Sequence, residues 1–179
     1  HNWQIGIADN GSIDSTPEVA KRLLYHYSRI RYIRLELRGR GRALRKAWME
    51  SEADILCYTD VDLSTDMGAL SELIVAVEDE GYDIAIGSRL KKGADVIGRS
   101  VNRELISRTY SLMFRTLFRT GFQDAQCGFK ALTRRSALKL LPWVQDTGWF
   151  FDTELLILAE KNGYRIKEVP ARWTDDQDS

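Results

Sequence analysis

Apolar and polar positions change period several times along this chain, and the changes predict alternating strands and helices. In the first half, apolar and β-branched runs predict four strands, at 3–9, 32–37, 54–60 and 82–89. Helical spacing of apolar residues predicts helices at 16–27 and 66–80, and a glycine-broken loop leads into a basic helix within 38–53. This alternation is typical of an α/β fold with a parallel sheet covered by helices.

The second half follows a different rhythm. A polar loop at 91–100 precedes a helix, a turn with a short strand, two further helices and a last strand, at 101–119, 122–133, 134–142, 149–163 and 164–173. No repeat, low-complexity segment or linker divides the sequence. We therefore expect a single domain over 1–179.

Charged residues close three of the predicted strands. Asp9, Asp60 and Arg89 end the first, third and fourth strands. Ligands of parallel sheets bind at the carboxyl ends of strands. The pattern therefore predicts that this edge of the sheet carries the functional site.

Charge and cysteine content narrow the classes of partner. The chain has 26 Lys and Arg against 26 Asp and Glu, so no bulk charge attracts nucleic acid, and we expect no nucleic-acid partner. Cys57 and Cys127 lie far apart without a CxxC pair, which favours a reducing, cytoplasmic location. No apolar run approaches the roughly 18 residues of a membrane span.

Three carboxylates follow the third predicted strand, in ILCYTDVDLSTD at 55–66. Asp60 and Asp62 point the same way, because side chains alternate along a strand. Two carboxylates this close suit a hard divalent ion, which also binds substrate phosphate. The alternative is a loop whose acids cap the next helix, a task that Asp66 alone can perform.

Other polar features allow both a functional and a structural interpretation. Asp9 could recognise a base or ribose, or it could open an Asx-turn with Asn10 that leads into a helix. Five cations at 38–46 begin a helix against its dipole, which slightly favours an anionic ligand over a solvated face. Arg89 could clamp a diphosphate with two hydrogen bonds, or pair with Asp60 or Asp62.

Two further segments carry acids that could be functional. Asp124, in DAQCGFK, could accept a proton from an incoming nucleophile or orient it. Asp152 and Glu154 fall in the first turn of the 149–163 helix, where the helix dipole favours acids, and we assign them no chemistry.

Eight segments in order resemble the family 2 glycosyltransferases of the GT-A fold, and among them the branch that loads sugars onto polyprenyl phosphate, such as dolichyl-phosphate glucosyl- and mannosyltransferases. The segments are IADNGSIDST, GRGRALRKAW, CYTDVDLSTD, DIAIGSRL, RELISRTYSLMFR, FQDAQCGFKAL, WFFDTELL and EVPARWTDDQDS. They cover nearly all of the chain. DAQCGFKAL and WFFDTELL are most similar to the glucosyltransferases.

The resemblance implies an inverting transfer of a hexose, with glucose favoured, from a nucleoside-diphosphate sugar, with UDP-glucose favoured. Asp9 and Asn10 would contact the nucleotide, and Arg89 would hold the diphosphate. Asp60 would also contact the nucleotide sugar. With Asp62 it would bind Mg²⁺ or Mn²⁺.

The acceptor implied by the resemblance is a polyprenyl or dolichyl phosphate. Arg103, Ser107 and Arg108 would bind its phosphate. Asp124 and Arg103 would act at the reacting centre. Mannosyl-type relatives carry Gln two residues after the second Asp, and this chain has Ser64 there. The resemblance therefore implies no third metal ligand.

The fold implied is a GT-A-type three-layer α/β/α sandwich with a mostly parallel central sheet. Family members begin with a further strand and helix, so we expect this chain to be truncated at its N-terminal side. The amphipathic 101–119 helix, rich in Arg and large apolar residues, predicts peripheral contact with the inner face of the membrane. The oligomeric state stays open.

Two other functions compete with the transferase. DVDLS approximates the motif of haloacid-dehalogenase-type phosphatases, in which Asp60 would attack phosphate and Asp62 would act as acid and base. That motif usually opens its domain, and the later paired acids are not evident here. The chain could also be a non-catalytic nucleotide-sugar-binding domain.

Overall fold

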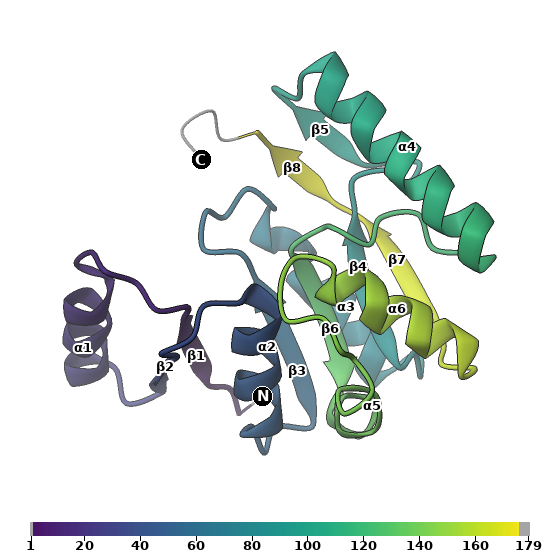
Figure 1. Cartoon of the computed structure of the whole chain (residues 1–179). Helices are drawn as coiled ribbons and strands as arrows, with labels where there is room; N and C mark the ends of the chain where they lie inside the picture. The colour runs from purple at the N-terminus through teal and green to yellow at the C-terminus, as the bar shows by residue number, and fades with distance from the viewer. Residues whose placement is uncertain (1, 176–179) are drawn as a thin grey trace.

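The predicted alternation of strands and helices is present in the computed structural model, which describes residues 2–175 (Figure 1). The strands are β1 (Ile5–Asp9), β2 (Ile30–Arg34), β3 (Ile55–Thr59), β4 (Ile84–Ser88), β5 (Asp95–Ile97), β6 (Phe129–Thr133), β7 (Ile166–Pro170) and β8 (Arg172–Thr174). The helices are α1 (Thr16–His26), α2 (Arg40–Met49), the short η1 (Met67–Ala69), α3 (Leu70–Glu78), α4 (Val101–Phe118), α5 (Arg134–Leu140) and α6 (Phe151–Lys161). The last four residues of the EVPARWTDDQDS segment lie outside the described residues.

The central sheet has the strand order β3-β6-β4-β7. β4 and β7 are parallel, while β6 lies between β3 and β4 and runs antiparallel to both. β1 and β2 form a separate parallel pair, and β5 and β8 form another. Three of the four strands run in the same direction, as predicted, but the short strand predicted within 122–133 lies between two of them and makes two of the three strand pairings antiparallel, so the sheet is mixed.

Side chains of the central sheet point alternately into two cores, as strand geometry requires. Ile84 and Ile86 face a core that contains Leu155 of α6, together with residues of α2, α4 and α5. Ala85, between them, faces the opposite core with Leu73 of α3. Helices therefore cover both faces, and the predicted α/β/α layering is confirmed.

Two predicted elements differ from the structure. The loop expected at 91–100 contains β5, and the strand expected at 164–173 is divided into β7 and β8. The backbone N–H of Ala171 donates to the carbonyl of Ser88 at the division. Beyond it, β8 pairs with β5 and forms a bridge to Thr65, so it fastens the loop that follows β3.

Several strand edges lack a strand partner within residues 2–175, among them one edge of β1 and one edge of β3. β1 pairs only with β2, and β3 pairs only with β6. Cys57 of β3 and Ile5 of β1 are exposed. No helix in the described part of the chain combines the length and the apolar character that a membrane span requires.

Candidate active site

Asp60 follows β3, and a glycine beside it makes room for its carboxylate. The backbone N–H of Asp60 donates to the carbonyl of Gly128 at 3.0 Å. A Cβ on Gly128 would lie 1.7 Å from Oδ2 of Asp60, so any side chain there would collide with the carboxylate. The glycine of DAQCGFK is therefore required for the close approach of a carboxylate to the backbone.

The loop after Asp60 keeps Asp62 at the surface. Asp62 is exposed, and its Oδ1 accepts a hydrogen bond from the N–H of Ser64 at 3.0 Å. Leu63 between them has a φ of 52°, which is uncommon for a residue with a side chain. Asp66 accepts from the N–H of Gly68 at 2.8 Å at the start of η1, so its predicted capping role is confirmed.

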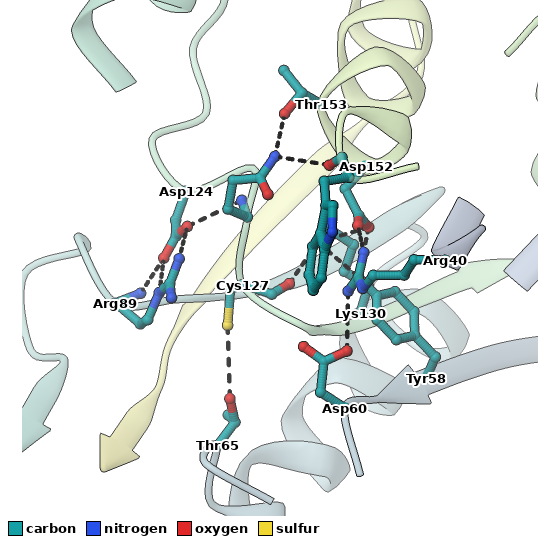
Figure 2. Close-up of polar contacts among 12 residues, drawn as sticks. Arg40, Tyr58, Asp60, Thr65, Arg89, Asp124, Cys127, Lys130, Asp152 and Thr153 are labelled. Atoms are coloured by element: carbon teal, nitrogen blue, oxygen red, sulfur yellow. Dashed lines mark hydrogen bonds and ion pairs between the residues drawn. The ribbon is translucent and has the colours of Figure 1, made fainter. Parts of the chain in front are cut away.

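A buried network of charges lies behind Asp60 (Figure 2). Arg40 donates from Nη2 to Oδ1 of Asp60 and to the Tyr58 hydroxyl, both at 3.1 Å, and its Nη1 contacts Asp152. Lys130 lies 3.1 Å from the Asp152 carboxylate, and both side chains are 1% exposed. The Tyr58 hydroxyl donates to Asp152 at 2.5 Å. The Asp60 carboxylate is thus attached, through Arg40, to a rigid buried ion pair.

Strand register explains why the network forms. Tyr58 and Lys130 are direct cross-strand neighbours on β3 and β6, and α6 brings Asp152 to them. Burial raises the pKa of Asp152, but the charges of Lys130 and Arg40 outweigh it, so the pKa lies below its ordinary value of 3.8. Asp152 lies in the first turn of α6, as predicted, and it also holds a buried ion pair that the sequence did not predict.

Arg89 and Asp124 form an ion pair with two parallel hydrogen bonds (Figure 2). Nε of Arg89 lies 2.8 Å from Oδ2, and Nη2 lies 2.9 Å from Oδ1. Burial raises the pKa of Asp124, but the hydrogen bonds and charge of Arg89 keep it below 3.8. A carboxylate held ionised in this way is a weak base. The alternative pairing of Arg89 with Asp60 or Asp62 is not observed.

A cavity of about 400 Å³ opens against this ion pair. Arg89 and Asp124 line it from the sheet side, and Ser107 lines it from α4. Much of the remaining wall is apolar or aromatic and includes Ile106, Tyr110, Phe114, Trp149 and Phe150. One cavity therefore combines a charged end with an apolar wall.

The three residues predicted to bind an acceptor phosphate all lie on α4, but only Ser107 lines the cavity. Arg103 is half exposed and contacts Asp175. Nε of Arg108 lies 2.6 Å from Oε1 of Glu104. The Ser107 hydroxyl accepts a hydrogen bond from Arg99, which lies in the segment predicted to be a polar loop and was not among the predicted site residues.

Asp9 and Asn10 lie on the β1–β2 side of the molecule. Oδ2 of Asp9 accepts from the Tyr32 hydroxyl at 2.5 Å and from Arg34 at 3.0 Å. Burial raises the pKa of Asp9, but hydrogen bonds from Tyr32 and Ser12 and the charge of Arg34 outweigh this effect. The pKa therefore lies below its ordinary value, and the carboxyl stays ionised. Asn10 accepts from the N–H of Gly39 at 2.6 Å, which ties this turn to the start of α2. The structure thus brings Asp60, Arg89 and Asp124 into one region and leaves Asp9 in another.

The acidic loop offers a small set of metal ligands. Within residues 2–175 no three His, Cys, Asp or Glu side chains gather as a metal-binding group. Asp60, with 43% of its side chain exposed, and the exposed Asp62 provide two carboxylates. This donor set fits a hard divalent ion that completes its coordination with water and ligand phosphate.

The two-sided α/β/α arrangement, with acids at the carboxyl end of β3, is that of the GT-A fold. Solved structures of glucosyl-3-phosphoglycerate synthase from Mycobacterium tuberculosis have the same fold. The complex with phosphoglyceric acid has a TM-score of 0.69 at 18% identity, over 96% of this chain and 59% of that one. The complex with Mn²⁺, UDP and glucosyl-3-phosphoglycerate has a TM-score of 0.69 at 16% identity, with the same coverage.

The sequence profile of Glycosyl transferase family 2 matches residues 1–141, and the chain belongs to this family. Glycosyltransferase AglD of Haloferax volcanii is 39% identical over 99% of this chain and 28% of its own length. Dolichyl-phosphate beta-glucosyltransferases of Saccharomyces cerevisiae and Dictyostelium discoideum are 29% and 31% identical, over 96% and 97% of this chain. The chain spans 57% and 56% of those two relatives. The family predicted from the eight segments is confirmed.

Proposed function

We propose that this chain is the catalytic part of an inverting glycosyltransferase that moves glucose from UDP-glucose to a polyprenyl or dolichyl phosphate. The observation that carries the proposal is the cavity in which the Arg89–Asp124 pair and Ser107 meet an apolar wall. The polar end suits a phosphate, and the wall suits a prenyl chain. Relatives named dolichyl-phosphate beta-glucosyltransferases support the acceptor and the sugar. A neighbouring structure solved with Mn²⁺ and UDP-glucose supports the donor.

On the donor side, Asp60 and Asp62 would hold Mg²⁺ or Mn²⁺. When bound, the ion supplies positive charge that stabilises the leaving diphosphate. Arg40 would give up its contact with Asp60 and keep its buried contacts with Asp152 and Tyr58, which leaves one N–H of its Nη2 for an anionic ligand. Arg89 would neutralise diphosphate charge from the end of β4. Asp9 and Asn10 would order the turn that receives the nucleotide.

On the acceptor side, the residues position a group that is already a nucleophile. A lipid phosphate is anionic, so it needs no strong base, and the low pKa of Asp124 suits an orienting role. Arg103, Ser107 and Arg108 would bind the phosphate, with Arg103 exchanging its contact with Asp175 for a phosphate oxygen. Arg103 and Asp124 would then flank the reacting centre.

The surroundings of the site suggest how the whole protein is placed. Large apolar side chains on α4 are exposed, among them Leu105, Leu112 and Leu117. We propose that α4 contacts the cytoplasmic face of the membrane, where a prenyl chain would enter the cavity. We also propose that residues 1–179 form one catalytic domain whose sheet is completed by a further strand between β1 and β3. The free edges of these strands support it.

The phosphatase and the binding-only interpretations gain no support. The family match covers the DVDLS segment on which the phosphatase interpretation rests. Asp60 is also fixed by Arg40, and the family match covers five of the other seven segments as well. Catalysis remains the simpler explanation for a cavity lined by an ionised acid.

The proposed function is tested by sugar transfer in the full-length gene product. UDP-glucose and GDP-mannose are offered with Mn²⁺ and a short prenyl phosphate, and the product is identified by its mass and anomeric configuration. We expect an inverted glucosyl product from UDP-glucose, reduced at least 100-fold by Asp62→Ala and unaffected by Asp79→Ala on the exposed end of α3. Phosphate release without sugar transfer, or donor binding without turnover, would contradict the proposal.

A further inference from the structure

A buried arginine outside the predicted site holds a hydroxyl that lines the cavity. The side chain of Arg99 is 7% exposed, and its Nη1 lies 2.8 Å from Oε2 of Glu104. Its Nη2 donates to the hydroxyl of Ser107. Arg99 itself is not part of the cavity wall, whereas Ser107 is. Any effect of Arg99 on a ligand in the cavity would therefore pass through its neighbours.

This contact determines what the Ser107 hydroxyl can do. A guanidinium has only donors, whereas a hydroxyl has one donor and two acceptor positions. Because Arg99 occupies an acceptor position, the O–H of Ser107 is left to donate. Within residues 2–175 no hydrogen bond uses this O–H as a donor. Its natural partner is then an acceptor atom brought by a ligand into the cavity.

The charges around Ser107 favour an anion as that ligand. Glu104 is shared by Arg99 through Oε2 and by Arg108 through Oε1. Arg103 is paired with Asp175. Three arginines therefore face two acids in this cluster, which leaves it with a net charge of +1 although each arginine contacts a carboxylate.

An aromatic ring keeps two of the arginines close together. The guanidinium carbon of Arg89 lies 5.6 Å from the ring centre of Trp173, and that of Arg99 lies 5.7 Å from it. Both distances fall in the range of cation–π attraction, which offsets part of the repulsion between like charges. Trp173 on β8 thus holds a second cation behind the Arg89–Asp124 pair.

We infer that Arg99 is a positioning residue that makes the Ser107 hydroxyl a dedicated hydrogen-bond donor to the acceptor's phosphate. The inference rests on the proposed function and specifies how its acceptor site selects a phosphate. A ligand oxygen that only accepts hydrogen bonds, as in a phosphate dianion, satisfies Ser107. A neutral prenyl alcohol has no surplus negative charge for the arginine cluster and binds weakly.

The test measures binding of a short prenyl phosphate to the full-length protein by calorimetry, without donor or metal. Four proteins form a double-mutant cycle: wild type, Arg99→Met, Ser107→Ala and the double variant. We expect each single variant to weaken binding about 10-fold, as for loss of one charge-assisted hydrogen bond. The double variant should lose less affinity than the product of the two single losses, because part of the effect of Arg99 runs through Ser107 while the loss of its charge acts on the phosphate directly. Arg115→Met, an exposed arginine on the same helix, is the matched control and should bind as wild type does.

Specific outcomes overturn the inference. Binding losses that multiply to about 100-fold in the double variant would show that the two side chains act independently. If the wild type and Arg99→Met bind prenyl phosphate with equal affinity, Arg99 has no role in acceptor binding. Failure of the wild type to bind the prenyl phosphate, or equal affinity for the prenyl alcohol, would also overturn it. If Arg99→Met does not fold, Arg99→Lys replaces it, and affinity equal to wild type would then contradict a role for the planar guanidinium.

The same variants separate this inference from the proposed function. Donor affinity, measured with UDP-glucose and Mn²⁺, should stay within twofold of wild type in Arg99→Met, while the KM for prenyl phosphate rises about 10-fold. Coupled phosphate binding without any sugar transfer would leave the inference standing and refute the transferase. Sugar transfer without coupling between Arg99 and Ser107 would support the transferase and refute the inference.

Discussion

Gly128 and Asp152 contribute no atom to the proposed reaction, yet each determines where the Asp60 carboxylate lies. Gly128 leaves the space that the carboxylate fills, and Asp152 anchors the arginine that contacts it. At the scale of single residues, the site therefore depends on neighbours that have no chemistry of their own.

Replacing Gly128 by alanine should displace Asp60. The new Cβ would lie 1.7 Å from Oδ2 of Asp60, so the carboxylate must move. We expect Mn²⁺ affinity and sugar transfer to fall at least 10-fold, measured by titration of the ion and by product formation. Gly6→Ala is the control, because its Cβ would meet only Ile33 at 3.9 Å. Wild-type affinity in the Gly128 variant would contradict this geometry.

Replacing Asp152 by asparagine should destabilise the fold strongly. Lys130 and Arg40 would lose their shared carboxylate, and removing one partner of a buried pair costs about 3–5 kcal/mol. The free energy of unfolding is measured by urea titration. Glu80→Gln breaks the surface pair with Lys167 and should cost less than about 1 kcal/mol. Equal losses in the two variants would argue against a buried network.

Sequence pattern located the acids and the arginine at the strand ends but not the residues that hold them. Asp60 and Arg89 stand where strands stop, which is a local signal. Lys130 and Arg99 look like ordinary surface cations, because burial depends on partners distant in the chain. The one sequence sign of a buried Lys130 was its position inside FKALT, a strand whose first four residues are all buried.

At the scale of elements, α4 combines two surfaces. Its Ser107 side lines the cavity, while Leu105, Leu112 and Leu117 are 63%, 65% and 70% exposed. The helix lies at the margin of the molecule in Figure 1. An arginine-bearing helix with exposed leucines is suited to lie at a lipid surface.

Glutamates on this helix should weaken membrane binding. Leu105 and Leu112 lie on one face, seven residues apart, and Leu105→Glu with Leu112→Glu removes apolar area and adds negative charge. We expect flotation with anionic liposomes to fall at least about 10-fold. Val75→Glu, at an exposed position on α3, serves as the control. Unchanged flotation, or equal loss in the control, would exclude α4 as the contact.

The existence of most elements was predictable, but the position of β6 was not. Local periodicity identified β1 to β4, the longer helices and a strand within 122–133. It contains no information about which strands become neighbours. β6 lies between β3 and β4 because Phe129 and Ala131 fit one core while Leu132 fits the other. The division between β7 and β8 was also missed, because residues 164–173 contain no Gly, Asn or Asp that would mark a turn between two strands.

At the scale of the whole molecule, buried ionised acids make stability depend on pH. The folded pKa values of Asp124 and Asp152 lie below 3.8, so the unfolded chain binds more protons at acidic pH. The stabilisation is present above about pH 5 and is lost as the pH falls through the folded pKa values.

Asp124→Asn should therefore flatten the acid side of the stability curve. The variant is less stable at pH 7, because Arg89 loses its charged partner, but its free energy of unfolding should change less between about pH 5 and pH 3. Urea titrations at several pH values measure both slopes. Parallel curves for variant and wild type would contradict the low pKa of Asp124.

The place of β6 also bears on how the protein is made. β3 and β4 do not pair with each other, and each meets β6, which follows both in the chain. A ribosome that has released β4 has therefore produced two strands without the one that joins them. Until residues 129–133 emerge, both strands present open hydrogen-bonding groups to chaperones and to neighbouring nascent chains. The rate of translation across residues 89–128 sets the length of that interval.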